Sequence, residues 1–348
     1  MLNPEDFVGV HEIAALAKVT KAAVSNWRNR FKDFPIPVTT LKAGPVFQKS
    51  SVLAWLRKRR VPMATVISMI NLKGGVAKTT STVAAAQMLD AEFKKRVLVV
   101  DLDPQTNATV MLIGDKRWKE LNDKGQTIAQ LFRDALNPET RIFDIRKSIQ
   151  TGVGNVGDVR RLALLPSSID LIDVQDHLAR MDSGRFHAAT PIDILRRALR
   201  PILEEDEFDF VLIDCPPSLG LVTLNGLRIS NYYIIPTIPD VLSTYGIPQI
   251  VKRVRDFSEN IGANIEPLGI VATKYRSQSS VHINQLKLLK QGRDAPLFET
   301  VIPENNDISA AAEYKSVSTM RQKWGYRGQF DIYRAFTKEI LEKVQVTA

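Results

Sequence analysis

The sequence predicts an α/β fold, with a mostly parallel, twisted sheet that has helices on both faces, preceded by a small N-terminal helical domain. From residue 65 onward, short apolar runs alternate with segments of helical periodicity, which is the pattern of βαβ units. The basic charge lies almost entirely ahead of that pattern, because residues 1–60 hold eleven Lys and Arg against four Asp and Glu, or +7 of the net +9. We therefore expect two domains, over residues 1–61 and 62–348, divided at Val61 and Pro62.

Composition narrows the class of protein. The 348 residues suffice for a full α/β core and a second, smaller domain. The single cysteine, Cys215, excludes an intrachain disulfide framework and indicates a reducing compartment. No run approaches the ~20 apolar residues of a membrane span, and residues 1–6 lack the basic and apolar regions of a signal peptide. We expect a cytoplasmic protein without membrane association, and its scattered histidines predict no metal-ligand cluster.

Residues 7–60 predict a helix-turn-helix domain that binds DNA. Helices are expected over residues 10–18 and 21–30, joined by a tight turn at Val19 and Thr20, with Thr20 as the N-cap of the second helix. A hairpin-like run over 38–47 and a third helix over 50–60 follow, an order that resembles the winged domains of the excisionase and MerR type. Asn and Arg can read base edges, and Lys, Ser and Arg can hold phosphates. The candidate DNA-binding residues of the second helix are Lys21, Ser25, Asn26, Arg28 and Arg30. The alternative is a three-helix oligomerisation or docking module.

Residues 65–80 read T-V-I-S-M-I-N-L-K-G-G-V-A-K-T-T and predict a phosphate-binding loop between a buried strand and a helix over about 79–93. Backbone N–H groups at the start of a helix converge on an anion, and glycines let the backbone approach it closely. Lys78 supplies positive charge for the β- and γ-phosphates, and the Thr79 hydroxyl is placed to ligate Mg²⁺. The residues predicted to hold the nucleotide here are Gly74, Gly75, Val76, Ala77, Lys78, Thr79 and Thr80.

The loop departs from the usual G-x-x-x-x-G-K-[ST] pattern, since Leu72 and Ala77 stand where its glycines would be. It reads K-G-G-x-x-K-T-T instead, with a second lysine at Lys73. This resembles the deviant Walker A motif of the ParA/MinD family of partition and positioning ATPases, which are P-loop NTPases. The resemblance implies that Lys73 reaches across an ATP-sandwich dimer to the phosphates of the partner. Glycine is commoner at Ala77 in that family, so we expect either a slightly strained loop or an altered nucleotide affinity.

Two predicted strands that end in aspartate carry the other motifs of the family. The strand over 96–102 leads into D-L-D-P-Q, and the strand that begins at residue 209 leads into D-C-P-P. The resemblance implies that Asp103 orients the attacking water, that Asp101 supports the Mg²⁺ and phosphate surroundings, and that Asp214 binds the Mg²⁺ shell. The lesser alternative is that the first two aspartates merely cap the next helix. The predicted catalytic residues are thus Lys73, Lys78, Asp103 and Asp214, and the predicted metal ligands are Thr79, Asp101 and Asp214.

Further positions follow from the same resemblance. Asn225, on a helix expected over 219–229, matches a position that faces the nucleotide or the partner subunit. Thr273, Lys274 and Pro303 are expected to border the adenine. Glu304 departs from the family pattern, which usually has a basic residue there.

The C-terminal region offers a second candidate contact with DNA. A basic and aromatic run that contains Arg321, Lys323 and Arg327 is a candidate for nonspecific DNA binding, with an ordinary solvated loop as the equal alternative. The helix expected over 329–344 carries apolar residues at spacings of three and four. That spacing predicts a packing face rather than a membrane-targeting helix.

Together these inferences predict a Mg²⁺-dependent ATPase with a slow intrinsic rate that partitions DNA. Its ATP-bound homodimer is expected to bind DNA nonspecifically, to associate with the nucleoid and to hydrolyse ATP when stimulated by a ParB-like partner. The N-terminal domain is expected to read an operator of its own gene. The alternatives are a ParA-like positioner of a protein cargo and an ATP-switched transcriptional regulator. A metabolic relative with this loop is a third, and the single cysteine argues against the nitrogenase iron-protein type.

Overall fold

The computed structural model describes residues 6–17, 20–58, 64–137, 139, 141–180, 191–205 and 207–347. The chain divides into two compact units, one of Met1–Thr65 with Arg197–Asp209 and the other of Val66–Arg196 with Phe210–Ala348. The predicted domain boundary at Val61 and Pro62 lies outside the described residues, as do the turn residue Val19 and the predicted helix ends at 18 and 60. That boundary stays a prediction.

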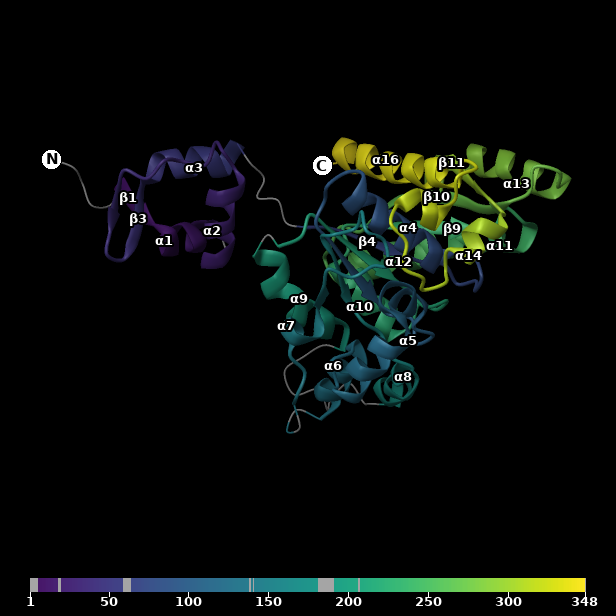
Figure 1. Cartoon of the computed structure of the whole chain (residues 1–348), viewed down its shortest axis with the longest axis horizontal. Coiled ribbons are helices and arrows are strands. Elements are labelled where there is room, and N and C mark those ends of the chain that lie inside the picture. Colours follow the sequence, from purple (N-terminus) through teal and green to yellow (C-terminus); the bar gives the residue numbers. More distant parts are fainter. Residues whose placement is uncertain are drawn as a thin grey trace. The chain divides into compact units, whose positions relative to one another are not determined.

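The first sixty residues form three short strands and three helices (Figure 1). The strands pair antiparallel in the order β1-β3-β2, and the helices lie where the sequence predicts them. Thr20 is the N-cap of the second helix, as expected, because its hydroxyl accepts the N–H of Ala23. Buried aromatic rings, among them Trp27 and Phe47, give this region a core of its own. The elements are β1 (Phe7–Gly9), α1 (Val10–Ala17), α2 (Lys21–Arg30), β2 (Thr39–Leu41), β3 (Gly44–Gln48) and α3 (Lys49–Lys58).

The rest of the chain is built on an eight-stranded sheet in the order β11-β10-β9-β4-β8-β5-β7-β6. Strand β10 pairs in parallel with β11 and β9, as do β9 with β4 and β5 with β8 and β7, whereas the short β6 is antiparallel to β7. The predicted mostly parallel α/β class is therefore confirmed. The strands are β4 (Thr65–Met69), β5 (Val97–Asp101), β6 (Gln150–Thr151), β7 (Leu162–Leu165), β8 (Phe210–Asp214), β9 (Tyr232–Thr237), β10 (Glu266–Tyr275) and β11 (Leu297–Pro303).

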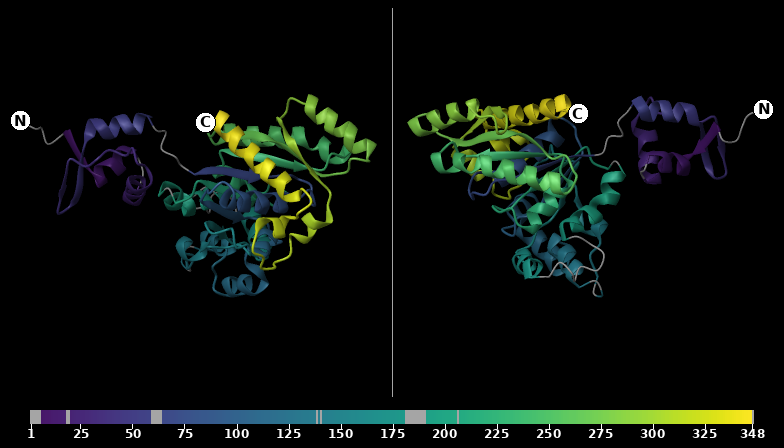
Figure 2. Two further views of the ribbon diagram at one scale, coloured as in Figure 1. Left: turned by 45° about the horizontal axis from the view of Figure 1, so that its top comes forward. Right: turned by 180° about the vertical axis from the view of Figure 1, so that it is seen from behind.

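Helices cover both faces of this sheet, and the two views of Figure 2 show α16 on one side and α12 on the other. Side chains alternate between the faces. Ile67 and Met69 join the core under α4 and α16, whereas the Ser68 hydroxyl lies on the opposite face within 2.8 Å of the Ser230 hydroxyl, just beyond α10. The helices are α4 (Lys78–Ala91), α5 (Asn107–Asp123), α6 (Ile128–Leu136), α7 (Ile145–Ser148), α8 (Leu171–Arg180), the 3₁₀ turn Pro191–Asp193, α9 (Ile194–Glu204), α10 (Leu221–Ile229), α11 (Val241–Tyr245), α12 (Ile247–Asn260), α13 (Ser280–Gln291), α14 (Asn306–Ala310), α15 (Met320–Trp324) and α16 (Gln329–Thr347).

The C-terminal helix α16 is a packing element, as predicted. Phe330, Tyr333, Phe336, Ile340 and Val344 are all buried in the main core. None of the described helices combines the length and the apolar character that crossing a membrane requires.

Candidate active site

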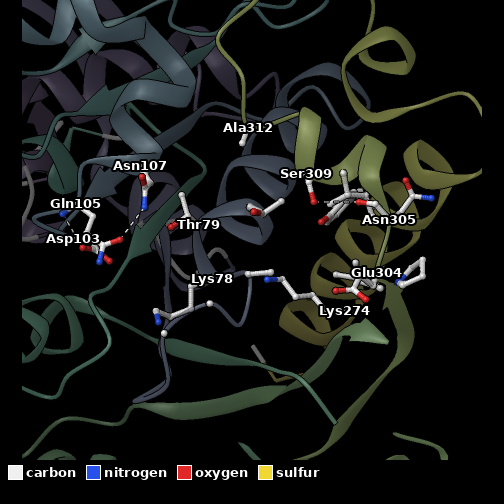
Figure 3. Close-up of a pocket in the computed structure, with 18 of the residues that line it drawn as sticks. Lys78, Thr79, Asp103, Gln105, Asn107, Lys274, Glu304, Asn305, Ser309 and Ala312 are labelled. Atoms are coloured by element: carbon white, nitrogen blue, oxygen red, sulfur yellow. Dashed lines mark hydrogen bonds between the residues drawn. The ribbon is translucent and has the colours of Figure 1, made fainter. Parts of the chain in front are cut away.

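A cleft of about 350 Å³ lies at the carboxyl ends of the parallel strands, where α/β proteins generally bind their ligands (Figure 3). The loop after β4 forms its floor, the loop after β5 forms one side, and the segment after β11 forms the other. Asp103, Gln105 and Asn107 therefore face Glu304, Asn305 and Ser309 across Thr79 in Figure 3. The predicted residues that line this cleft are Gly74, Gly75, Ala77, Lys78, Thr79, Thr80, Asp103, Lys274 and Pro303.

The backbone of the β4–α4 loop is open to the cleft. A Cβ atom added at Gly74 or Gly75 would have no heavy atom within 4 Å outside its own chain neighbours, so the loop borders open space. The N-cap residue of α4 is Ala77, whose side chain offers no acceptor to the first turn of the helix. The N–H groups of that turn are consequently available to an anion. Behind the loop, the Thr273 hydroxyl donates to the Val76 carbonyl oxygen at 3.1 Å and fixes the turn.

Ala77 has a left-handed backbone, with φ 62° and ψ 30°. An L-residue in this region suffers a clash between its Cβ and the next carbonyl, which costs about 1–2 kcal/mol. Glycine has no Cβ and adopts the same angles without that cost. The strain expected from the sequence is therefore present at the residue that immediately precedes Lys78.

We expect Ala77→Gly to raise the free energy of unfolding by about 0.5–1 kcal/mol, since relief of strain exceeds the added chain entropy of glycine. Denaturant unfolding without nucleotide measures the change. Gly75→Ala is the matched control in the same loop, because Gly75 has φ +74° and its Cβ would meet nothing within 4 Å. It should lower the stability by a similar amount. An unchanged or lower stability of Ala77→Gly would show that the left-handed alanine stores no strain.

Lys78 is buried at the start of α4, and its ammonium donates to the carbonyl oxygens of Asn71 at 3.3 Å and Lys73 at 3.2 Å. Burial lowers the pKa of Lys78, and the carboxylates of Asp214 and Asp103 oppose that shift. The cation is thus held in a site of low polarity that phosphate oxygens can enter, where their mutual attraction is stronger than in water.

Asp214 ends β8 and is fully buried. Its Oδ1 atom lies 3.4 Å from the Thr82 hydroxyl, and its Oδ2 atom has no hydrogen-bond partner among the described residues. Burial raises the pKa of Asp214 well above its ordinary value, the charge of Asp101 adds to the shift, and Thr79 and Lys78 oppose it. A buried carboxylate oxygen without a donor is costly, and a hydrated cation would satisfy it. The predicted metal role of Asp214 with Thr79 therefore fits the donor set.

Asp101 is held by hydrogen bonds from its own chain. It is buried and does not line the cleft. Its Oδ1 accepts the Asp103 N–H, and its Oδ2 accepts both the N–H and the hydroxyl of Thr109 at 2.9 and 2.7 Å. Burial raises the pKa of Asp101 to about 7 against these hydrogen bonds from Thr109. Asp101 thus fixes the turn that presents Asp103 and the start of α5, and its predicted support of the Mg²⁺ surroundings stays a prediction.

Comparisons with known proteins identify the family. The family model described as an AAA domain matches residues 64–266, more than half of the chain. The sporulation initiation inhibitor protein Soj of Bacillus subtilis is 30% identical over 252 residues, which are 72% of this chain and 89% of Soj. The chromosome partitioning protein ParA of Myxococcus xanthus is 28% identical over 249 residues, which are 72% of this chain and 78% of ParA. The chain belongs to the ParA/MinD family of ATPases.

A solved relative shows the same fold with nucleotide in place. Cobyrinic acid a,c-diamide synthase from Mycobacterium smegmatis, with bound ADP and magnesium, is 27% identical at a TM-score of 0.61, covering 82% of this chain and 97% of that one. The cofactors of this ParA/MinD-family ATPase are ATP and Mg²⁺. The cleft at the end of β4 offers hydrogen-bond donors to the phosphates and a hydroxyl oxygen, that of Thr79, to the metal ion.

The geometry of the cleft suits hydrolysis of a terminal phosphate. Lys78 and the first turn of α4 line the cleft where the phosphates would lie. Thr79 also lines it, and Asp214 is buried outside the lining; these two residues would hold the cation, which neutralises phosphate charge when bound. Asp103 lines the cleft opposite them, with its Oδ1 fixed by the Gln105 N–H at 2.9 Å. Asp103 thus lines the same cleft as the phosphate-binding loop, and its role as the acceptor for the attacking water stays a prediction.

Lys73, the residue that distinguishes this family, lies on the rim. Its side chain is 42% exposed, and its ammonium donates to Asp240 Oδ2 at 2.9 Å and to the Ser243 hydroxyl at 2.8 Å. Partial burial works against ionisation of Asp240, but hydrogen bonds from Ser243 and Lys73 prevail and lower its pKa. Lys73 does not line the cleft of its own chain, which agrees with a role in trans.

Three predicted nucleotide residues do not line the cleft. Asn225 is fully buried, and its amide bonds the Leu195 N–H at 3.0 Å and the carbonyl oxygens of Pro191 and Leu221. It therefore fastens α10 to the segment ahead of α9 instead of facing a ligand. The Val76 side chain is buried and leaves only its backbone to the loop, and Thr273 supports that backbone from behind.

The predicted C-terminal DNA cluster is not a basic surface. Lys323 is buried, its ammonium donates to the Glu313 carbonyl oxygen at 2.8 Å, and burial lowers its pKa to about 8. Arg321 makes two hydrogen bonds to Asp331. Of the three candidates, only Arg327 is exposed and forms no salt bridge with the described residues. Basic residues beside an aromatic run can fold inward when their charged ends reach a carbonyl or a carboxylate, which sequence alone does not reveal.

The N-terminal candidates lie on α2 as expected. Lys21, Ser25, Arg28 and Arg30 are exposed, and Asn26 is half-buried. Their contacts with bases and phosphates stay a prediction.

Sequence reasoning missed several residues of the cleft. Gln105 ends the quoted D-L-D-P-Q motif and Asn107 follows two residues later, so both could have been assigned from their place beside Asp103. Asn305, Ser309 and Tyr333 come from segments after β11, and no local motif marks them.

Proposed function

We propose that this ATPase partitions DNA through an ATP-dependent dimer. In this cycle the ATP-bound homodimer binds nonspecific DNA at the nucleoid, and a ParB-like partner stimulates hydrolysis and release. The observation that carries the proposal is Lys73, an exposed cation beside the ATP cleft that does not reach into the cleft of its own chain.

The surface around Lys73 supports association with a second copy. Beside its partner Asp240, helix α11 exposes Leu242 to 81% and Tyr245 to 78%. Exposed apolar side chains that adjoin a functional cation are typical of a contact surface. A second subunit placed there would cover them and receive Lys73.

Nonspecific DNA binding has a candidate surface on α12. This helix buries Ile250, Val251 and Val254 and leaves Lys252 and Arg253 exposed on its other side. Phosphate contacts by such side chains give affinity without sequence preference and weaken with salt. We assign the nonspecific contact to α12 in preference to the C-terminal cluster.

The N-terminal domain would add operator binding through α2, whose exposed Lys21 and Arg28 suit phosphates and base edges. The two alternatives, a positioner of a protein cargo and an ATP-switched regulator, share the ATP site and differ in what is bound.

DNA binding by the full chain tests the proposal. Binding to nonspecific duplex and to the upstream region of the gene is compared with ADP and with a slowly hydrolysed ATP analogue. We expect salt-sensitive nonspecific binding only with the ATP analogue, lost in Lys252→Ala/Arg253→Ala and retained in Lys21→Ala/Arg28→Ala. The second variant should lose only preference for the upstream region.

Other outcomes decide between the candidates. Nonspecific binding that ignores the nucleotide, or its absence in both states, would contradict the partition cycle. Tight upstream binding in any nucleotide state with negligible turnover would favour the regulator. ATP-dependent dimers without DNA affinity would favour the protein-cargo positioner.

A further inference from the structure

The turn that carries Asp103 is tied to another part of the chain through Ser167. The Ser167 hydroxyl donates a hydrogen bond to the Asp103 carbonyl oxygen at 2.7 Å. Within the part of the chain that the structure describes, this is the only hydrogen bond that joins residues 103–106 to a residue outside the segment of β5 and α5. Ser167 is fully buried in the loop after β7 and does not line the cleft.

The register of the sheet brings the two residues together. In the parallel pair of β5 and β7, Val100 lies opposite Leu165. Neighbouring strands in register leave the sheet at the same edge, so the residues that follow them lie side by side. Ser167, two residues beyond Leu165, therefore reaches Asp103, three residues beyond Val100.

The backbone of Ser167 is itself held on both sides. Its N–H donates to the Thr109 hydroxyl in α5 at 2.9 Å. Its carbonyl oxygen accepts the indole N–H of Trp118 at 3.1 Å. These bonds fix the main chain at position 167, so the serine hydroxyl has a defined place from which to hold Asp103.

The turn needs a support of this kind because its backbone is strained. Thr106, its last residue, is left-handed, with φ 57° and ψ 19°. An L-residue is unfavourable in this region and stays there only where the surrounding structure holds it. The Asp103 carbonyl oxygen accepts the Thr106 N–H at 2.9 Å as well as the Ser167 hydroxyl, which uses both of its lone pairs. Alanine at position 167 would leave the turn to its internal bonds.

The place of the Asp103 carboxylate follows from the place of its backbone, since an aspartate side chain is short. Asp103 lines the cleft together with Lys78 and Thr79 (Figure 3). A carboxylate that takes a proton from water must lie within hydrogen-bond reach of that water. A displacement of about 1 Å can lower the rate of such a step about 100-fold.

We propose that Ser167 is a positioning residue for ATP hydrolysis, whose hydroxyl holds the turn so that the Asp103 carboxylate meets the attacking water. The inference rests on the predicted acceptor role of Asp103 and is independent of DNA partition. It concerns the rate of hydrolysis and not the affinity for ATP, because Ser167 lies outside the lining of the cleft.

Single-turnover hydrolysis by full-length Ser167→Ala, at saturating ATP and Mg²⁺, tests the proposal. We expect the rate to fall about 5- to 20-fold, because the turn loses its outside support. The affinity for a slowly hydrolysed ATP analogue should stay within about twofold of wild type. Ser168→Ala is the matched control, since Ser168 is equally buried but its hydroxyl accepts the Asp170 N–H at 3.1 Å. Its rate should stay within about twofold of wild type.

The same substitution in an Asp103→Asn background separates positioning from general support. If Ser167 acts through the Asp103 carboxylate, Ser167→Ala should change the rate of Asp103→Asn by less than about twofold, because the group that it positions is already lost. A general loosening of the cleft would lower the rate by the same factor in both backgrounds.

Trp118→Phe provides a second and milder variant, for use if thermal unfolding shows that Ser167→Ala does not fold. Trp118 is half-buried, and phenylalanine keeps an aromatic ring but lacks the N–H that holds the Ser167 carbonyl. We expect it to lower the rate of hydrolysis about 2- to 5-fold with the affinity for the ATP analogue unchanged.

Each other outcome overturns the inference. Wild-type turnover by Ser167→Ala, or by Trp118→Phe if the first variant does not fold, would mean that the turn holds Asp103 without help. Equal losses of rate in both backgrounds, or an affinity that falls as far as the rate, would mean that Ser167 supports the cleft as a whole. Normal turnover by Asp103→Asn would remove the acceptor role itself, whereas a slow Asp103→Asn beside a normal Ser167→Ala would remove this inference alone.

Discussion

Lys78→Ala is expected to weaken ATP binding by about 100-fold or more and to abolish hydrolysis. A charge-assisted hydrogen bond contributes about 1.5–3 kcal/mol, and the ammonium of Lys78 is placed to make such bonds to two phosphates. Its loss also leaves Asp214 and Asp103 without the cation that offsets them, so their charge would repel the triphosphate. Calorimetric titration with a slowly hydrolysed ATP analogue measures the affinity, and phosphate release measures turnover.

Lys274→Ala is the matched control for Lys78→Ala, because it removes a positive charge from the same cleft but at a different position. Lys274 lines the same cleft, but at the end of β10 and away from the loop. We expect the Lys274→Ala variant to bind the ATP analogue less than about tenfold more weakly than wild type, which is the loss expected for one partly exposed contact. If Lys78→Ala bound the analogue within about threefold of wild type while remaining folded, the phosphate-binding role of this loop would be wrong.

Asp103→Asn is expected to lower the rate of hydrolysis about 100-fold while ATP binding stays near the wild-type affinity. A positioned acceptor for the attacking water contributes about 10²–10⁴ in rate, and an amide cannot accept a proton as a carboxylate does. Asparagine keeps the Oδ1 acceptor that fixes the Gln105 N–H, so the turn should be retained. Single-turnover hydrolysis at saturating ATP and Mg²⁺ isolates the chemical step.

Gln105→Ala is the matched control for the aspartate. Gln105 lines the cleft two residues away and is exposed; its backbone N–H bonds Asp103, and among the described residues its side chain accepts only the long hydrogen bond from Asn107 at 3.3 Å. Its variant should hydrolyse ATP within a few-fold of wild type, whereas the aspartate variant should accumulate as an ATP-bound dimer. Normal turnover by Asp103→Asn would reject the assigned role.

The elements predicted most closely are those whose sequence signal is local. Helix α2 coincides with the helix predicted over 21–30, because the Thr20 hydroxyl caps its first turn and the N-cap residue can be recognised from the sequence. Helix α5 was overlooked because Gly114, with φ 74°, divides it into two pieces whose apolar periodicity does not continue across the kink.

The residues of the site likewise fall into those that a local motif predicts and those that only tertiary packing brings to the cleft. The loop residues from Gly74 to Thr80 could be predicted because one motif sets both their chemistry and their spacing. Tyr333 could not, since it reaches the cleft only through the packing of α16 against α14. Lys323 appeared solvated because lysine usually is, yet a carbonyl of Glu313 lies close enough to accept its buried ammonium.

The ion pair between Lys73 and Asp240 makes the proposed association an exchange of partners. The ammonium already has a carboxylate and a hydroxyl in its own chain, so moving it to the phosphates of another subunit replaces contacts instead of adding them. From this lysine, only the difference between the two sets of contacts contributes to holding the subunits together. When the terminal phosphate leaves, Lys73 can pair with Asp240 of its own chain again, so the subunits separate without leaving the ammonium unpaired. A dimer built on such an exchange is easily reversed, which is what a cycle of assembly and release requires.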